Sequence, residues 1–228
     1  MSRNQNVAPL FGVFREILTD YMKNVYTCIP AHVKTFDPAT QLAQIELGIK
    51  RVDIDGSSVA PPPIIDCPVL MIGDQFMLET QIDPEAEGMA FFSQRCIDGW
   101  VNTGGVAENP LTRFFDMQDA FFIAGFRPMP KAIPDFQNNG MRLRNRKGDQ
   151  WVWLKNDGSI FIENGKGHIR MDAGGTVTIN GVTIDTASNV TSPATITGNT
   201  DVVAAGISGK GHTHGGVQGG SSSTGKPQ

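Results

Sequence analysis

The feature that most constrains the fold is a series of alternating apolar pairs in the second half of the chain. The members of each pair are separated by one residue, as in Val152 and Leu154 or Ile160 and Ile162. Successive pairs lie roughly eight residues apart, often with Asp-Gly, Asn-Gly or Gly-Gly between them. Alternation with a period of two places both apolar side chains on one face of a strand. The pattern therefore predicts a stack of short strands, a β-solenoid.

Such a stack cannot bury its apolar face within one chain. Each strand has little apolar surface, and strands at the edges remain unpaired. Three chains winding together would solve both problems, with each strand pairing with the next subunit. A flexible tail rich in Thr, Gly and Ser is the alternative, but it does not explain the alternating Val and Ile residues. We therefore predict an intertwined trimeric β-helix, or prism, over residues 141–209.

The prism should narrow toward its end, and two of the four histidines follow there, in the segment Lys210–Gly216. In an extended segment, His212 and His214 would point to the same side, and Gly211 and Gly215 allow the backbone to approach closely. Two imidazoles are too few for a metal ion, but three chains on a threefold axis would provide six. A solvated polar segment is the alternative interpretation. We predict a metal-binding apex and tail over residues 210–228, with His212 and His214 as ligands.

The ligand type restricts the metal. Imidazole suits iron, nickel, copper and zinc, whereas calcium and magnesium prefer oxygen ligands. Zinc prefers four ligands in a tetrahedron, which six crowded histidines would not offer. The residues therefore exclude calcium and magnesium and disfavour zinc, and they leave the choice among the other metals open.

The first half of the chain has a different pattern of apolar residues. Residues 9–25 predict an amphipathic helix, with Pro9 in the first turn and apolar residues at steps of three and four. Short strands follow, and their number and spacing predict a small antiparallel barrel of the OB type. Three prolines then mark a linker. The predicted class is all-β with a leading helix, and the predicted segments before the prism are the N-terminal helix arm at 1–28, the OB-fold collar at 29–126 and the linker at 127–140.

Composition and motifs narrow the function. A net charge of −4 without a dense Lys/Arg stripe argues against a nucleic-acid partner. Cys28, Cys67 and Cys96 are odd in number and lack CxxC spacing, which favours reduced thiols and synthesis in a reducing cytoplasm. We find no secretion signal and no apolar run long enough to span a bilayer.

Catalytic motifs are missing from the sequence as well. There is no GxSxG, phosphate loop, GxGxxG or HExxH. His32 and His168 stand alone and are interpreted as structural. A metallohydrolase built on His212 and His214 would need a general base, yet no Asp or Glu follows Asp201. We predict a protein that is not an enzyme and has no small-molecule substrate.

Three stretches resemble a known family, the central spikes or membrane-puncturing devices at the baseplates of contractile-tailed bacteriophages. Residues 29–41 are similar to the opening hairpin of the spike OB domain, and residues 93–105 and 116–128 are similar to later motifs of that domain. The C-terminal prism with its His-x-His extends the resemblance over nearly the whole chain. No lysozyme-like domain of the kind that some relatives insert is found.

The resemblance implies a homotrimer in the virion tail baseplate, docked on the tail hub and in transient contact with the host outer membrane. It implies one iron ion per trimer, held by His212 and His214 of three chains, with residues 217–228 folding back around the ion. It also implies that the chain pierces the membrane when the tail contracts. The alternative is an OB-fold module that binds a glycan or nucleic acid and carries a passive stalk.

Overall fold

The computed structural model describes residues 7–53, 55–216 and 219–220. The chain divides into two compact units, the first ending at Ala132 and the second beginning at Ile133. The division falls within the predicted linker at residues 127–140. The predicted all-β class with a leading helix is confirmed.

The leading helix α1 (Val7–Lys23) is close to the predicted range, and every side chain from Leu10 to its end is exposed. Directly after the helix, Tyr26 holds the chain against Phe115 and Phe92. The backbone N–H of Tyr26 donates to the carbonyl oxygen of Phe115 at 3.0 Å. The Tyr26 ring also packs on Phe92, with 5.3 Å between ring centroids. A short connection, anchored at Tyr26, therefore joins the helix to the strands of the first unit.

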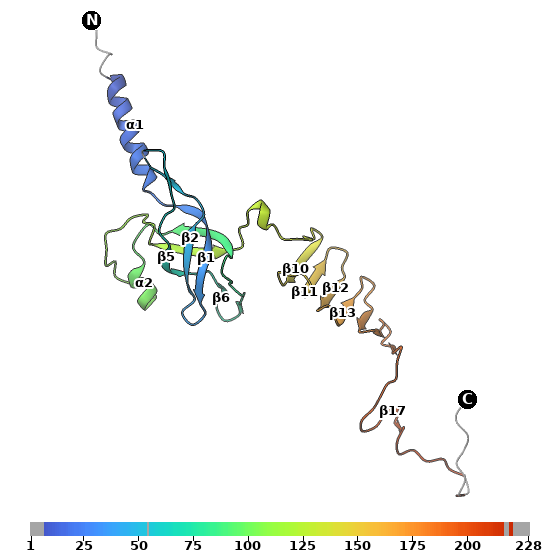
Figure 1. Cartoon of the computed structure of the whole chain (residues 1–228). Coiled ribbons are helices and arrows are strands. Elements are labelled where there is room, and N and C mark those ends of the chain that lie inside the picture. Colours follow the sequence, from blue (N-terminus) through green and yellow to red (C-terminus); the bar gives the residue numbers. More distant parts are fainter. Residues whose placement is uncertain (1–6, 54, 217–218, 221–228) are drawn as a thin grey trace. The chain divides into compact units, whose positions relative to one another are not determined.

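The first unit is built on a five-stranded antiparallel sheet, ordered β5-β2-β1-β8-β9. Its strands are β1 (Cys28–Asp37), β2 (Leu42–Leu47), β5 (Ile64–Pro68), β8 (Glu87–Phe92) and β9 (Ala120–Ala124). A bridge between Val69 and Phe122, with a hydrogen bond of 2.9 Å from Leu70 N to Phe122 O, joins the segment after β5 to β9. The sheet therefore curls into a partly closed barrel, visible in Figure 1.

Strict alternation of buried and half-buried residues along β2 and β8 places one face of each strand in the barrel core. Val33, Ile45, Ala90 and Phe122 are fully buried there. Shorter elements complete the unit. They are β3 (Arg51–Val52), β4 (Ser58–Val59), β6 (Ile72–Gly73), β7 (Met77–Leu78), α2 (Asp98–Thr103) and the 3₁₀ turn η1 (Met129–Lys131).

The sequence interpretation misplaced one strand. The apolar run at residues 69–72 predicts a strand from the sequence alone, but the barrel strand is β5, immediately before it. The prolines at 61–63 and Pro68 made this segment look unlike a strand in the sequence. In addition, Asp66 adopts a positive φ of 52° that interrupts regular alternation. Of the expected strand, only Val69 is buried.

Gly88 marks a close approach between β8 and β9. A Cβ atom at this position would overlap the carbonyl oxygen of Ile123 and the ring of Phe122. We expect Gly88→Ala to destabilise the barrel by about 1–3 kcal/mol, because a buried ring and a strand must both move. Gly12→Ala is the matched control, since nothing lies within 4 Å of its Cβ position in α1. Urea unfolding of the full chain checks this, and equal midpoints for the two variants would contradict it.

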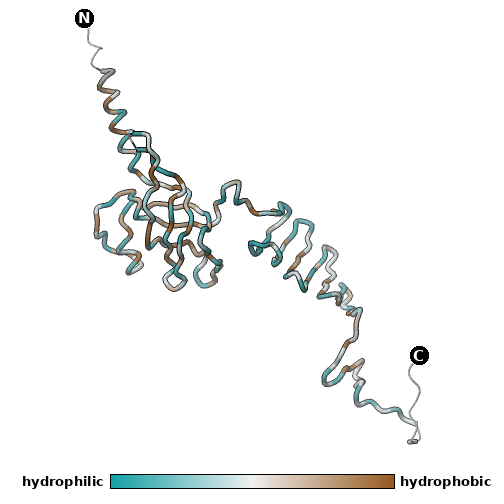
Figure 2. The backbone as a smooth tube through the Cα atoms, in the orientation of Figure 1, coloured by the Kyte–Doolittle hydropathy of each residue, from teal (hydrophilic) through white to brown (hydrophobic). Residues whose placement is uncertain are grey.

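The second unit is a ladder of seven short strands in sequence order, each antiparallel to the next. The strands are β10 (Gly140–Arg144), β11 (Trp151–Lys155), β12 (Ile160–Glu163), β13 (His168–Met171), β14 (Val177–Ile179), β15 (Val182–Ile184) and β16 (Val190–Thr191). Figure 1 shows its first strands as a regular succession, and Figure 2 shows apolar and polar residues alternating along it. Beyond the ladder, β17 (Val203–Ala204) and β18 (Ile207–Ser208) form a small hairpin.

Strand pairing in this ladder differs from the prediction that each strand would pair with the next subunit. From β11 to β15, each strand pairs with two strands of its own chain. The turns explain the difference. Asn180 and Gly181, with φ of 47° and 95°, form the two-residue link between β14 and β15, and such turns join antiparallel neighbours in one chain.

Candidate functional site: an apolar sheet face and a histidine pair

The ladder places its apolar side chains on one face. The cross-strand register aligns them in two columns, because each apolar residue lies opposite another in the next strand. The first column is Met141, Leu154, Ile160, Met171, Val177, Ile184 and Val190; the second is Leu143, Val152, Ile162, Ile169, Ile179 and Val182.

Eleven of these thirteen side chains are between 36% and 61% exposed in the single chain. An antiparallel sheet usually covers one face with a core. Here the apolar face has no cover among the described residues of the chain. A continuous apolar patch of this kind marks a surface that binds another protein surface.

On the opposite face of the ladder, arginine side chains lie over aromatic rings of the same chain. The guanidinium of Arg142 lies 4.4 Å from the ring centre of Trp151 and 5.0 Å from that of Trp153. Arg170 lies 5.3 Å from the ring centre of Phe161. Cations over aromatic rings leave a polar outer surface over apolar groups. On this face, charged side chains of the same chain cover the apolar groups. The face with the two apolar columns has no such cover among the described residues.

The chain is held firmly just before the histidine pair. The carboxylate of Asp201 accepts hydrogen bonds from the backbone N–H of Val202 at 2.8 Å and from that of Lys210 at 3.0 Å. The pKa of Asp201 is lowered by the hydroxyl of Ser208 and by the Lys210 backbone. An ionised Asp201 thus fixes the start of the segment that carries the histidines.

His212 lies in a turn that brings it back on Ser208. Its backbone N–H donates to the Ser208 carbonyl oxygen at 3.2 Å, and its ring Nδ1 lies 2.8 Å from the same oxygen. A carbonyl oxygen only accepts, so Nδ1 is the donor in this contact, and Nε2 is the ring nitrogen left to bind a metal ion when the ring is neutral. Histidines that bind metals usually donate their other ring nitrogen to a carbonyl or carboxylate in this way.

His214 lies beside His212, with 5.1 Å between the ring centroids and 76° between the ring planes. Both side chains are exposed, and neither residue is in a strand. The donor set, two adjacent imidazoles of which one is oriented through its Nδ1, fits a metal ion shared with other chains. The tail predicted to fold back around the ion lies outside the described residues, apart from 219–220.

The other two histidines lie on strands, each opposite a glutamate of the adjacent strand. His32 lies on β1, with Nε2 3.4 Å from a carboxylate oxygen of Glu46 on the adjacent strand. His168 lies on β13, opposite Glu163 on β12. Their interpretation as structural residues stays a prediction.

One cluster with metal-ligating groups was not anticipated from the sequence. Ligand atoms of Cys96, Asp98 and Asp119 lie within 4.8 Å of one another. However, Arg113 occupies the place of a cation. Its Nη2 lies 2.9 Å from Asp98 Oδ1 and 2.8 Å from Asp119 Oδ1.

Further contacts make this cluster structural. Arg113 Nε donates to the second oxygen of Asp119 at 3.0 Å, and the Ile97 backbone N–H donates to Asp119 at 3.0 Å. The hydrogen bonds with Asp119 raise the pKa of Arg113 above its usual value, so it stays charged. Burial raises the pKa of Cys96, which keeps it a thiol. The residues of this cluster lie up to 23 positions apart, so the sequence offered no local signal for them.

Two family models match the chain. Residues 29–125 match the N-terminal domain of the phage protein Gp138, and residues 206–228 match the GpV Apex motif. Both are families of structural phage proteins of the baseplate and spike. The chain is a phage spike-type structural protein. No curated protein matches it.

The matches confirm the resemblance to a baseplate central spike. The first covers the barrel of the spike protein and is consistent with an OB-like fold. The second includes His212 and His214. The matches to structural phage families indicate a component of the virion tail. Within the described ranges, none of its helices has the length and hydropathy to cross a bilayer.

Proposed function

We propose that this chain forms the homotrimeric central spike that pierces the host outer membrane when the phage tail contracts. The observation that carries the proposal is the uncovered apolar face of the seven-stranded ladder. Three ladders that turn this face toward a common axis would form a closed prism with a dry interior. Sheath contraction would supply the work, and the prism would have to resist buckling.

Three copies suit the chain better than two. Two sheets could also cover their apolar faces as a sandwich. A sandwich, however, would bring together only four imidazoles of His212 and His214, whereas a threefold assembly supplies six. Six nitrogen ligands suit an octahedral metal ion, and iron is the choice that the family resemblance implies.

The residues of the apex have distinct tasks in this proposal. Asp201 fixes the backbone before the apex, and the carbonyl of Ser208 orients the ring of His212 with Nε2 outward. A bound iron ion would cross-link the three chain ends through the imidazoles of His212 and His214. Such a cross-link would stiffen the narrow end, where Ala204 and Ala205 offer little packing surface.

We also propose that the barrel, predicted at residues 29–126, is the collar that docks on the tail hub. Its β6–β7 hairpin supports this proposal, because it holds apolar side chains in solvent. Exposed fractions reach 61% for Ile72 and 92% for Phe76 at its turn. A hairpin of this kind suits a protein contact better than a free surface.

The double substitution of His212 and His214 by Ala tests the apex. We expect the unsubstituted protein to contain three chains and one iron ion per particle. The double variant should stay trimeric but lose its metal, since the ladder face is intact. Thr213→Ala, at the exposed residue between the histidines, should keep the metal and serves as the control. Light scattering with elemental analysis measures both quantities, and metal that persists in the double variant would refute the assigned ligands.

A further inference from the structure

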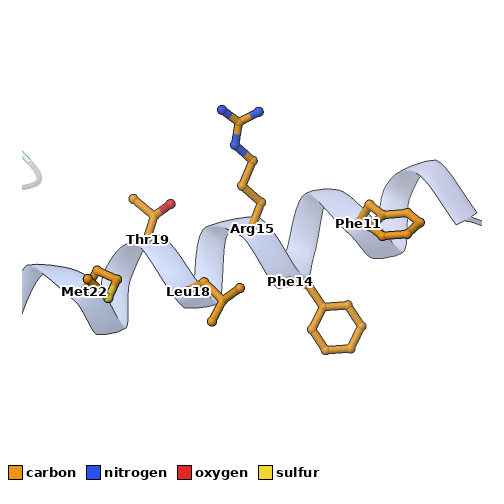
Figure 3. Close-up of a pocket in the computed structure, with 6 residues that line it drawn as sticks. All are labelled: Phe11, Phe14, Arg15, Leu18, Thr19 and Met22. Carbon is orange, nitrogen blue, oxygen red and sulfur yellow. The ribbon is translucent and has the colours of Figure 1, made fainter.

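The leading helix α1 has an apolar surface that the proposed spike does not yet use. Eight apolar side chains from position 10 to position 22 are between 51% and 70% exposed. They are Leu10, Phe11, Val13, Phe14, Ile17, Leu18, Tyr21 and Met22. Figure 3 shows several of them around an open hollow along the helix. At about 100° per residue, these positions cover about half of the helix circumference.

The width of this surface indicates how many partners cover it. A two-stranded coiled coil buries a narrow seam of two positions per heptad, whereas a helix in a larger bundle buries a wider stripe. Leu10, Phe14, Ile17 and Tyr21 follow heptad spacing with steps of four, three and four. The remaining apolar residues widen this seam on both sides. A helix that contacts two others, as in a three-helix bundle, fits this pattern.

The polar side of α1 identifies the kind of partner. Its charged residues are Arg15, Glu16, Asp20 and Lys23, two of each sign. A helix that lies on a membrane surface usually has a polar face rich in Lys and Arg. Here the charges balance, and Lys23 lies 3.6 Å from Asp20. Copies of this helix would therefore not repel one another.

Charge placement also fits a ring of copies. Arg15 borders one edge of the apolar stripe, and Asp20 borders the other. In a rotationally symmetric ring, one edge of each helix faces the opposite edge of the next. Arg15 of one copy would then face the edge of the next copy that contains Asp20, five residues along, or about 7.5 Å of helix rise.

We propose that α1 is a second trimerisation element, in which the helices of three copies of this chain pack in parallel along their apolar stripes. The inference rests on the proposed trimer of the ladder. The anchored connection at Tyr26, three residues beyond the helix end, favours the parallel arrangement. In a threefold particle, the three helices would start from equivalent points and stay in register.

Disulfide cross-linking of the full chain tests this proposal. Phe14→Cys places a thiol at the centre of the stripe, and Glu16→Cys places one on the exposed polar side as a matched control. Both are made with Cys28→Ser, because Cys28 is exposed while Cys67 and Cys96 are buried. Under mild oxidation, we expect covalent dimers to form at least about tenfold faster for Phe14→Cys, because the bundle raises the effective thiol concentration. Leu10→Cys provides a second stripe position.

The particle mass of the same samples separates the outcomes. A trimer in which Phe14→Cys and Glu16→Cys cross-link equally slowly would overturn the helix bundle and leave the spike intact. Such a result would assign the stripe to another baseplate protein. Cross-links that join separate trimers into six-chain species would also overturn it. A monomeric protein without cross-links would refute the trimer itself, and with it the proposed function.

Discussion

Ile179→Asp is expected to weaken the proposed spike trimer strongly, so that it dissociates at much higher protein concentration than the unsubstituted protein. Ile179 lies in the second apolar column of the ladder and is 43% exposed in a single chain. In a closed prism, three carboxylates would be buried without partners, each at a cost of several kcal/mol. In the isolated chain the same carboxylate would remain in water. The substitution should therefore act on assembly, with little effect on the fold of the ladder.

The adjacent residue gives a matched control for this experiment. Thr178 precedes Ile179 on β14, so its side chain lies on the opposite, polar face. Thr178→Asp adds the same charge one residue away and should leave the particle trimeric. Sedimentation or light scattering measures the mass of both variants. If both substitutions weaken the trimer equally over a dilution series, or if neither does, the apolar columns are not the assembly face.

Arg113→Met is expected to cause the largest loss of stability in the barrel. Asp119 is 0% exposed, and the Arg113 guanidinium contacts both of its oxygens. Methionine keeps much of the length but removes the charge, which leaves a buried carboxylate unpaired. Breaking a buried pair from one side costs about 3–5 kcal/mol. Hydrogen exchange of the Ile97 amide, which donates to Asp119, reports on this site in the full protein.

Two further variants make this result specific. Lys34→Met removes ion pairs of 3.2 Å with Glu46 and 3.7 Å with Glu85, but these side chains are between 33% and 61% exposed. Ion pairs in contact with solvent contribute little to stability, so exchange at Ile97 should hardly change. Combining Arg113→Met with Asp119→Leu removes both charges and should recover part of the loss. No protection loss in Arg113→Met alone would contradict the structural assignment of the cluster.

The fold was predictable where alternation is strong. The spacing of Val152 and Leu154, and of Ile160 and Ile162, identified strands that share one apolar face. Alternation does not reveal which chain supplies the neighbouring strand, because the buried face is the same in either case. The relevant signal was turn chemistry, such as Asn180-Gly181, which links neighbours in the same chain.

The histidine pair was also predictable, because a His-x-His motif between glycines is visible in the sequence. The backbone contact that orients His212 could not be predicted from the sequence. The contact of His212 with the Ser208 carbonyl depends on a turn that returns the chain four residues back. Likewise, Arg113 and Asp119 meet Asp98 only through folding of the barrel, so no spacing rule indicates them.

Pairing within one chain has a consequence for how the particle forms. Each ladder strand contacts the strand that comes next in sequence, so its contacts are local and its contact order is low. Such a meander can fold strand by strand during synthesis, before other chains are present, because the loss of loop-closure entropy at each step is small. Assembly would then join sheets that are already folded. The proposed trimer, if made this way, would exchange whole subunits without unfolding them, whereas interwoven strands would have to unfold first.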